Sequence, residues 1–512
     1  MRTVTFLISG DEARTVIESL AELGFVFEPS RAVTTTVLDT FDGRLHRARL
    51  RLELHESDGL ELVLSGDETV PARLAVTGAP RFPTDLPPGP FRARLAALVD
   101  VRALLPQISV TAERTTAAWR DASDKVVATA QLDEQIRVVD PAGADGPAAT
   151  VEIHEVTGYA KRARRAVDVL DRLGLPKCET DTVSACATAA DVDLGGYAAT
   201  ATVPLDPQMP AVDGYRAVLT NLATAITANW EGTIDQSDTE FLHDLRIAVR
   251  RTRTVLGEAK AVVPAGVRTP ARAGFAWLAG LTGPARDLDA YLLEWDRYTG
   301  PLGSEVVASL APVRALLEQR RADAHTDLER ALRSQQAADL MSTWTAWLGR
   351  PLDREYCDVR AERPLGRLVA KRMARAHSIV VEHGRLIDPD TPAQQVHDLR
   401  KDAKKLRYLL ECFGSLLPDR PRKRFVKRLK ALQDNLGEHQ DAEVHVAMLR
   451  AIAHELHGAG ASSDTMVAIG QLTERLDQHR LAARAEFADR FADFDTKATQ
   501  GALDAMLEGI LR

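Results

Sequence analysis

An internal repeat constrains the fold of this 512-residue chain more than any other feature. The segments LHDLRIAVRRTRTVL and VHDLRKDAKKLRYLL carry His243 and His397 at their second positions, 154 residues apart. The same offset continues without a gap to Gly283 and Gly437. One offset held over such a span indicates a duplicated helical unit. Because two copies generally pack about a pseudo-twofold axis, we expect the two segments to line one shared groove.

Each copy carries basic and histidine side chains at positions i, i+3, i+7 and i+10, which lie on one face of a helix. An apolar stripe beside them packs into a bundle and leaves the charged ends wet. Solvated faces usually mix charge signs, whereas these are all basic or histidine. We therefore predict a binding ladder for a polyanion, with ordinary solvated faces and structural histidines as the alternative. The first stripe is His243, Arg246, Arg250 and Arg253, and the second is His397, Arg400, Lys404 and Arg407.

The overall charge argues against a general cationic nucleic-acid binder, because the net charge is −8 and the pI is near 6.0. Positive charge is local instead: residues 397–430 hold twelve lysines and arginines against four acids. A basic segment on an acidic protein favours a specific anionic ligand.

Several common classes of site have no motif in the sequence. It lacks a P-loop, HExxH and GxSxG, and we expect neither a metal nor a cofactor. The N-terminus does not resemble a signal peptide and no apolar run approaches ~18 residues, so we expect a soluble cytoplasmic protein without membrane contact. The scattered cysteines fit a reducing compartment; they are Cys178, Cys186, Cys357 and Cys412.

The pattern of apolar residues divides the chain in two. Residues 1–190 alternate between strand-like and helical segments, 191–212 resemble a linker, and 213–512 are helical throughout. The sequence therefore predicts an N-terminal α+β domain and a C-terminal all-α domain of two repeated bundles. The expected strands are 4–8, 48–56, 60–65, 115–119, 125–133 and 149–156.

The region from about residue 205 to the end resembles the CHAD family. The resemblance rests on LHDLRIAVRRTR, LTGPARDLDAY, VHDLRKDAKKLRYLLECF and LKALQDNLGEHQDAEV. It implies a helical pair of similar bundles that binds inorganic polyphosphate through the basic residues of the repeated helices, and an association with polyphosphate granules. The eight stripe residues are the binding positions that the resemblance implies.

A further basic run adds Lys423, Lys427 and Lys430 on one helical face. The equivalents of the last two in the first repeat are Ala273 and Ala276, so we expect the second half to dominate binding. The repeated acids Asp287 and Asp441 are expected to pair with stripe arginines rather than to touch a phosphate.

The first 190 residues resemble a CYTH domain, the triphosphate tunnel fold, through LDTFDGRLHRARLRLEL and TVEIHEV. The resemblance implies an antiparallel tunnel-like barrel whose first strand carries Glu-x-Glu-x-Lys. Here that strand reads Thr3-Val4-Thr5-Phe6-Leu7, and Ser184-Ala185 replaces a Ser-Lys pair. Glu152 is kept, but His154 follows it on the same face. Because triphosphate hydrolysis needs carboxylates to hold Mg²⁺ or Mn²⁺, we expect no enzyme activity.

These observations favour a non-enzymatic polyphosphate-binding protein of undetermined oligomeric state. The stripes lack aromatic residues apart from Tyr408, whereas single-stranded nucleic-acid sites usually stack bases on aromatic rings. The alternatives are a metal-dependent triphosphatase in the N-terminal domain, with Arg49, Arg51 and Arg114 in its tunnel, backbone-only nucleic-acid binding, or a scaffold. We expect the two stripe histidines to supply the pH dependence of binding, and the arginines and lysines a pH-independent part.

Overall fold

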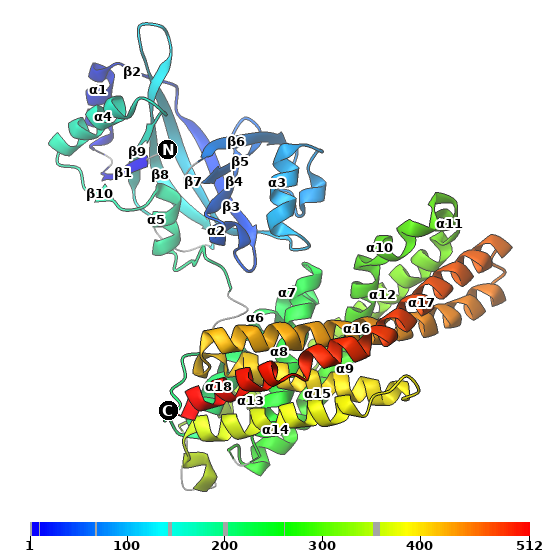
Figure 1. Cartoon of the computed structure of the whole chain (residues 1–512). Coiled ribbons are helices and arrows are strands. Elements are labelled where there is room, and N and C mark those ends of the chain that lie inside the picture. The colour runs from blue at the N-terminus through cyan, green and yellow to red at the C-terminus, as the bar shows by residue number, and fades with distance from the viewer. Residues whose placement is uncertain are drawn as a thin grey trace. The chain divides into compact units, whose positions relative to one another are not determined.

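The computed structural model describes residues 3–9, 11–66, 69–141, 146–197, 203–260, 262–351 and 359–511. The chain forms two compact units, Met1–Ala199 and Thr200–Arg512 (Figure 1). Both parts of the predicted fold class, an α+β unit followed by an all-α unit, are confirmed. Three thiols, of Cys178, Cys186 and Cys412, are free, and Cys357 lies outside the described residues.

The predicted linker, residues 191–212, has described residues at both ends. Tyr197 donates a backbone hydrogen bond of 2.9 Å to Phe41 and stacks on its ring within the first unit. Pro207 accepts one of 2.9 Å from Gly366 within the second unit. Residues 198–202 lie outside the described residues, so the linker itself stays a prediction.

The N-terminal unit is built on one antiparallel sheet with the order β10-β1-β9-β8-β7-β3-β4-β5-β6, and β2 pairs with β7. The predicted strands correspond to β1, β4, β5, β8, β9 and part of β7, while β2, β3, β6 and β10 were not predicted. The strands are β1 (Thr3–Ile8), β2 (Phe25–Phe27), β3 (Arg31–Thr40), β4 (Leu50–Glu56), β5 (Leu60–Gly66), β6 (Thr69–Val76), β7 (Leu104–Arg120), β8 (Val126–Asp140), β9 (Ala149–Glu155) and β10 (Lys177–Cys178).

Side-chain alternation decides which residues of this sheet are covered by helices. Phe6 of β1 and Ile153 of β9 are buried in one cluster with apolar residues of α1 (Ala13–Leu23) and α4 (Ala160–Arg172). Successive strand residues point to opposite faces, so Thr5 and Glu152 face away from these helices. The remaining helices of this unit are α2 (Arg44–Arg47), α3 (Pro90–Val99) and α5 (Thr182–Ala189), with a 3₁₀ turn η1 (Pro83–Asp85).

The C-terminal unit is helical throughout its described residues. Its α-helices are α6 (Ala211–Ala228), α7 (Trp230–Ile234), α8 (Thr239–Glu258), α9 (Ala265–Leu293), α10 (Trp295–Thr299), α11 (Ser304–Ser309), α12 (Ala311–Leu332), α13 (Gln335–Gly349), α14 (Leu365–Arg385), α15 (Ala393–Cys412), α16 (Asp419–Gly458), α17 (Ser463–Phe494) and α18 (Lys497–Leu511). Short 3₁₀ turns are η2 (Gly300–Leu302), η4 (Val359–Glu362) and η5 (Gly414–Leu416).

The sequence repeat is also a repeat of helix boundaries. Shifting α8 by 154 positions gives residues 393–412, which are the bounds of α15. The same shift carries the first residues of α6 and α9 onto those of α14 and α16. Equivalent prolines precede these helices, Pro210 and Pro364 in one pair and Pro264 and Pro418 in the other. The duplicated unit is therefore three helices long at least.

The two repeats meet as a pseudo-twofold arrangement predicts. Pro210 and its equivalent Pro364 form an antiparallel bridge. The neighbouring amide of Ala211 donates to the carbonyl of Arg363 over 2.9 Å, and the equivalent amide of Leu365 donates to the carbonyl of Met209 over 2.8 Å. Such a reciprocal exchange between equivalent residues is the local signature of a twofold axis.

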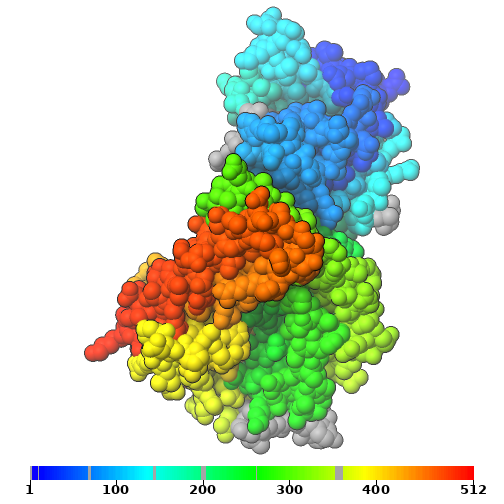
Figure 2. Space-filling model, turned by 90° about the vertical axis from the view of Figure 1, so that its right-hand side faces the viewer, coloured from blue at the N-terminus to red at the C-terminus, as the bar shows by residue number. Residues whose placement is uncertain are grey.

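Equivalent helices also pack against each other, α6 on α14 and α8 on α15. Apolar residues from all four belong to one buried cluster, so the two bundles share a single core. Figure 2 shows the green surface of the first repeat beside the yellow surface of the second on one face of this unit. The repeats differ at their far ends, where α9 stops at Leu293 while α16 continues to Gly458 and pairs along its length with α17 (Figure 1).

The shared core predicts that equivalent truncations in the two repeats destabilise the same unit. Leu245 and Leu399 are related by the offset of 154 and are both 0% exposed. Leu245→Ala and Leu399→Ala should each lower the free energy of unfolding by ~2–5 kcal/mol. Urea unfolding followed by circular dichroism at 222 nm should show both variants shifting one common helical transition. Two helical transitions, each sensitive to only one substitution, would contradict a shared core.

Candidate functional site

The two predicted stripes lie on α8 and α15, which pack side by side at the junction of the repeats. The carboxylate of Asp238 accepts hydrogen bonds from the first amides of α8, and Pro392 precedes α15 at the equivalent position. The buried side chains of Val249 and Ala403 face the core and fix the rotation of each helix. The basic side chains are consequently held at the edge of the core rather than free on the surface.

The outer arginines of the stripes are fixed by the repeated acids. Arg246 lies 3.7 Å from Asp287, and Arg400 donates to Asp441 over 3.0 Å. The predicted acid–arginine pairing is therefore confirmed in both repeats. A Cβ atom at Gly283 would lie 3.3 Å from a nitrogen of the Arg246 guanidinium, so a side chain there would crowd the arginine.

The histidines at the head of the stripes are half-buried. The Nδ1 atom of His397 lies 2.7 Å from the amide oxygen of Gln440, which fixes the imidazole ring against α16. His243 occupies the equivalent place on α8. Neither histidine lines the cavity that the stripes border.

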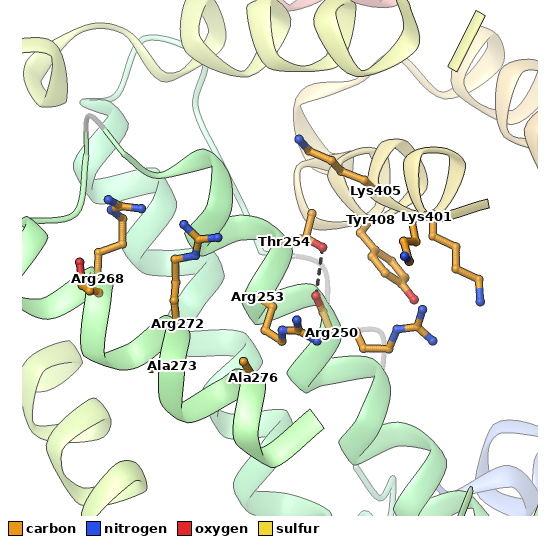
Figure 3. A pocket seen from close by; sticks show the side chains of 12 residues that line it. Arg250, Arg253, Thr254, Arg268, Arg272, Ala273, Ala276, Lys401, Lys405 and Tyr408 are labelled. Atoms are coloured by element: carbon orange, nitrogen blue, oxygen red, sulfur yellow. Dashed lines mark hydrogen bonds between the residues drawn. The ribbon is translucent and has the colours of Figure 1, made fainter. Parts of the chain in front are cut away.

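A cavity of about 600 Å³ opens between α8, α9 and α15, and we call it the basic groove. Figure 3 shows the arginines of α8 and α9 on two neighbouring helices, with the labelled side chains of α15 across from them. Seven of the twelve lining residues are basic and none is acidic. The lining residues are Arg250, Arg253, Thr254, Arg268, Thr269, Arg272, Ala273, Ala276, Lys401, Lys404, Lys405 and Tyr408.

Two lysines of the basic groove have counter-charges: Lys401 lies 3.0 Å from Asp398 and Lys405 lies 2.5 Å from Glu258. The other five cations have no carboxylate within 4.0 Å among the residues that the structure describes. Unpaired cations this close together repel one another, and an anion would remove that repulsion. These five are Arg250, Arg253, Arg268, Arg272 and Lys404.

The repulsion appears in the proton affinities of the groove. Burial, reinforced by Arg400 and Arg250, lowers the pKa of Lys404 to about 7. Burial and the neighbouring Arg250 and Arg272 also lower the pKa of Arg253. The expectation that the lysines contribute independently of pH is therefore wrong for Lys404, because a desolvated amine among like charges loses its proton more easily.

The predicted site residues fall into separate groups. Arg250, Arg253 and Lys404 line the groove, whereas Arg407 is held by Glu411 at 2.6 Å, outside the lining. The three α16 lysines are exposed and do not line the groove either; they are Lys423, Lys427 and Lys430. Their roles, and the predicted dominance of the second half, stay predictions.

Sequence analysis missed two arginines of the groove. Arg268 and Arg272 lie one helical turn apart on α9, in the first repeat. The comparison of repeats considered only Ala273 and Ala276 on this helix and judged it poor in charge. The spacing i, i+4 was visible in the sequence and would have identified both arginines.

A second cavity, of about 1010 Å³, lies inside the N-terminal unit and is lined by residues of β1, of β3 to β10 and of α5. Arg49, Arg51 and Arg114 line it, as predicted. Thr3 and Thr5 also line it, and the hydroxyl of Thr3 lies 3.1 Å from Nδ1 of His154. The sheet therefore encloses a tunnel-like interior, and residues of the first strand face that interior.

Two carboxylates of this cavity, those of Glu152 and Asp181, are already bonded within the protein. Glu152 accepts hydrogen bonds from the amide and hydroxyl of Thr182 at 2.8 and 2.7 Å. Asp181 lies 2.8 Å from Arg51. Among the described residues no group of three or more His, Cys, Asp or Glu side chains has the geometry to hold a metal ion. The interior therefore does not fit the Mg²⁺ or Mn²⁺ ion that the tunnel resemblance implies.

Arginines and acids also neutralise each other deeper in this unit. Arg114 donates to both oxygens of Asp133, at 2.8 and 3.0 Å. Burial raises the pKa of the Glu53 carboxyl. His55, whose ring nitrogen lies 2.9 Å away, outweighs this effect, and the pKa of Glu53 is lowered overall. The N-terminal cavity thus differs from the basic groove, because its buried arginines Arg51 and Arg114 are paired with carboxylates.

The part of the chain that contains the repeated helices α8 and α15 matches a known protein family. Residues 217–450 match the model of the CHAD domain family. This part of the chain is a CHAD domain. The CHAD domain structure from the plant Ricinus communis is 26% identical, with 60% of this chain and 96% of that chain covered and a TM-score of 0.45. PptA from Streptomyces chartreusis is 20% identical, with 55% and 99% covered and a TM-score of 0.44.

The N-terminal unit is similar to another group of structures. HpAC1 from Hippeastrum, described as having a dominant triphosphatase activity, is 11% identical, with 38% of this chain and 99% of that chain covered and a TM-score of 0.28. The comparison with curated proteins gives no match. Within the described residues, none of the helices has the length and apolar character needed to span a bilayer.

Proposed function

We propose that the CHAD domain binds inorganic polyphosphate without converting it chemically, and that the basic groove is the main binding site. One observation carries the proposal: five unpaired cations from three helices surround a cavity whose lining holds no acid. Desolvated cations without counter-charges are costly, and a dense chain of phosphates would supply the missing charge along the whole groove.

The chemistry of the lining favours polyphosphate over nucleic acid. Polyphosphate has no bases, so its recognition needs cationic donors and no stacking surface. Tyr408 is the one aromatic residue of the lining, and the guanidinium of Arg250 lies 6.0 Å from its ring centre. The aromatic face is thus shared with a cation, which disfavours base stacking but leaves backbone-only nucleic-acid binding as the alternative.

We further propose that the N-terminal unit is not a triphosphatase. Three carboxylates of its cavity, those of Glu152, Asp181 and Glu53, are bonded to Thr182, Arg51 and His55. The first strand also presents threonines where the tunnel family has glutamates. The role left to this unit is a structural or weak anion-binding one. Binding of long polyphosphate by the helical unit would by itself suffice for association with polyphosphate granules in the cytoplasm.

Charge reversal tests the proposed binding site. Arg400→Glu with Lys404→Glu should weaken binding of long-chain polyphosphate by at least ~30-fold, which corresponds to about 2 kcal/mol for lost contacts of paired charges. Fluorescence titration at several salt concentrations should also show a smaller salt slope, because fewer counterions are released. The matched control is Arg330→Glu with Arg490→Glu, the same charge change at exposed sites outside the groove. Equal affinities in the two double variants, both with normal circular dichroism, would sink the proposal.

The pH profile of binding separates Lys404 from the histidines. In the protein without a ligand, Lys404 has a pKa of about 7. A bound polyanion raises this pKa, so above pH 7 the protein takes up a proton when the polyanion binds. Affinity should therefore rise as the pH falls from 9 to 7 and level off below it for this residue.

Measurements between pH 9 and 8 consequently report on Lys404. Lys404→Arg should flatten the profile in that range, because an arginine stays charged throughout it. The double variant His243→Gln with His397→Gln should keep the wild-type slope between pH 9 and 8. Isothermal titration in two buffers of different ionisation enthalpy gives the proton count directly. A Lys404→Arg variant that keeps the wild-type slope between pH 9 and 8 contradicts this assignment.

The absence of catalysis is tested directly. With Mg²⁺ or Mn²⁺, the purified protein should release no phosphate from tripolyphosphate, ATP or thiamine triphosphate above the background rate. A malachite-green assay over hours is sensitive enough to show slow turnover. Metal-dependent release that disappears in Glu152→Ala would show that the N-terminal cavity is an active site.

A further inference from the structure

The three lysines of the basic groove differ in what their amino groups touch. Lys401 and Lys405 each lie in an ion pair, with Asp398 and Glu258. Lys404 has no carboxylate within 4.0 Å among the described residues, and it is half-buried, so its amino group is still reachable through the groove. Two of the three lysine amino groups in this cavity are thus held in ion pairs, and the third, that of Lys404, is not.

Cations face Lys404 from three helices. On its own helix Arg400 lies one turn away, and on α8 Arg246 and Arg250 act on it. Arg268 and Arg272 of α9 line the same cavity. From α16 the facing acid is Asp441, which is hydrogen-bonded to Arg400 and therefore shared. The remaining charged or titratable neighbours on α15 are Lys401, Lys405 and Tyr408.

This environment favours the neutral amine, which carries the lone pair that an ammonium lacks. Desolvation and adjacent cations are the two means by which proteins activate lysine as a nucleophile. The lowered pKa of Lys404, about 7, is consistent with both. The surrounding guanidinium groups are in addition the donors best suited to hold a phosphate.

We infer that Lys404 is a site of covalent acylation by small acyl phosphates, whose phosphate group is held by the arginines of the basic groove. The amine attacks the carbonyl carbon, a C–N bond forms, and the C–O bond to the phosphate breaks. The amine proton leaves with the phosphate as hydrogen phosphate, and no oxidant or reductant is needed. The inference rests on the anion binding proposed for this groove.

Acylation would change the groove itself. The product amide has no charge, so the modified residue can no longer pair with a phosphate. Because Lys404 lies between the cations of α8 and those of its own helix, its loss weakens the groove at the junction of the repeats. The level of acyl phosphate would thereby set the affinity for polyanions.

Acetyl phosphate is the probe for this reaction. The full-length protein is incubated with it at pH 7 to 8, and acetylation of each lysine is followed over time by peptide mapping with mass spectrometry. We expect Lys404 to react at least roughly tenfold faster than Lys401 and Lys405, because its neutral fraction at this pH is far larger. Tripolyphosphate should slow the reaction of Lys404 but not that of exposed lysines elsewhere.

Acetic anhydride, which carries no phosphate, separates the reactivity of the neutral amine from the binding of the reagent's phosphate by the arginines. In the double variant Arg268→Gln with Arg272→Gln, the preference of acetyl phosphate for Lys404 over the other two lysines should fall. The preference of acetic anhydride for Lys404 should stay unchanged in this variant. Equal rates for the three lysines, or a preference for Lys404 with acetyl phosphate that is unchanged in Arg268→Gln with Arg272→Gln, overturn the inference. Polyphosphate binding measured on the same preparation distinguishes the two proposals: intact binding without selective acetylation refutes only the inference, and selective acetylation without polyphosphate binding refutes only the proposed function.

Discussion

Packing of α8 against α15 is the interaction on which the rest of the helical unit depends. The buried apolar stripes of the two helices belong to one core, and this core fixes the rotation of each helix about its own axis. Arg250 and Lys404 occupy equivalent positions, 154 residues apart, and both are thereby brought to one cavity. The core thus offsets an electrostatic cost, because it holds like charges together without carboxylates between them.

The chain manages its charges in two opposite ways. In the N-terminal unit the buried arginines Arg51 and Arg114 are paired with Asp181 and Asp133. In the basic groove of the helical unit, carboxylates pair only with Lys401 and Lys405, and the other five lining cations have no carboxylate within 4.0 Å among the described residues. A self-neutralised interior offers little to an incoming polyanion, whereas the unpaired cations gain from one. The contrast explains why we assign binding to the helical unit.

Duplication followed by divergence accounts for the asymmetry of the groove. Lys404 and Arg250 are equivalents, but Arg272 has Val426 as its equivalent and Lys427 has Ala273. Each repeat has therefore placed its extra cations at different points of the same helix. Those of α9 line the basic groove, while those of α16 lie exposed on the other repeat.

The sequence by itself determined the repeat, the two basic stripes, the pairing of Asp287 and Asp441 with stripe arginines, and the class of both units. These follow from local rules, since helical periodicity and strand alternation fix which side chains share a face. It did not determine which stripe members meet, because that depends on how α8, α9 and α15 cross. Only the tertiary structure placed Arg268 and Arg272 beside the stripes. It also decided the protonation of Lys404, because desolvation and repulsion arise from neighbours that are remote in sequence.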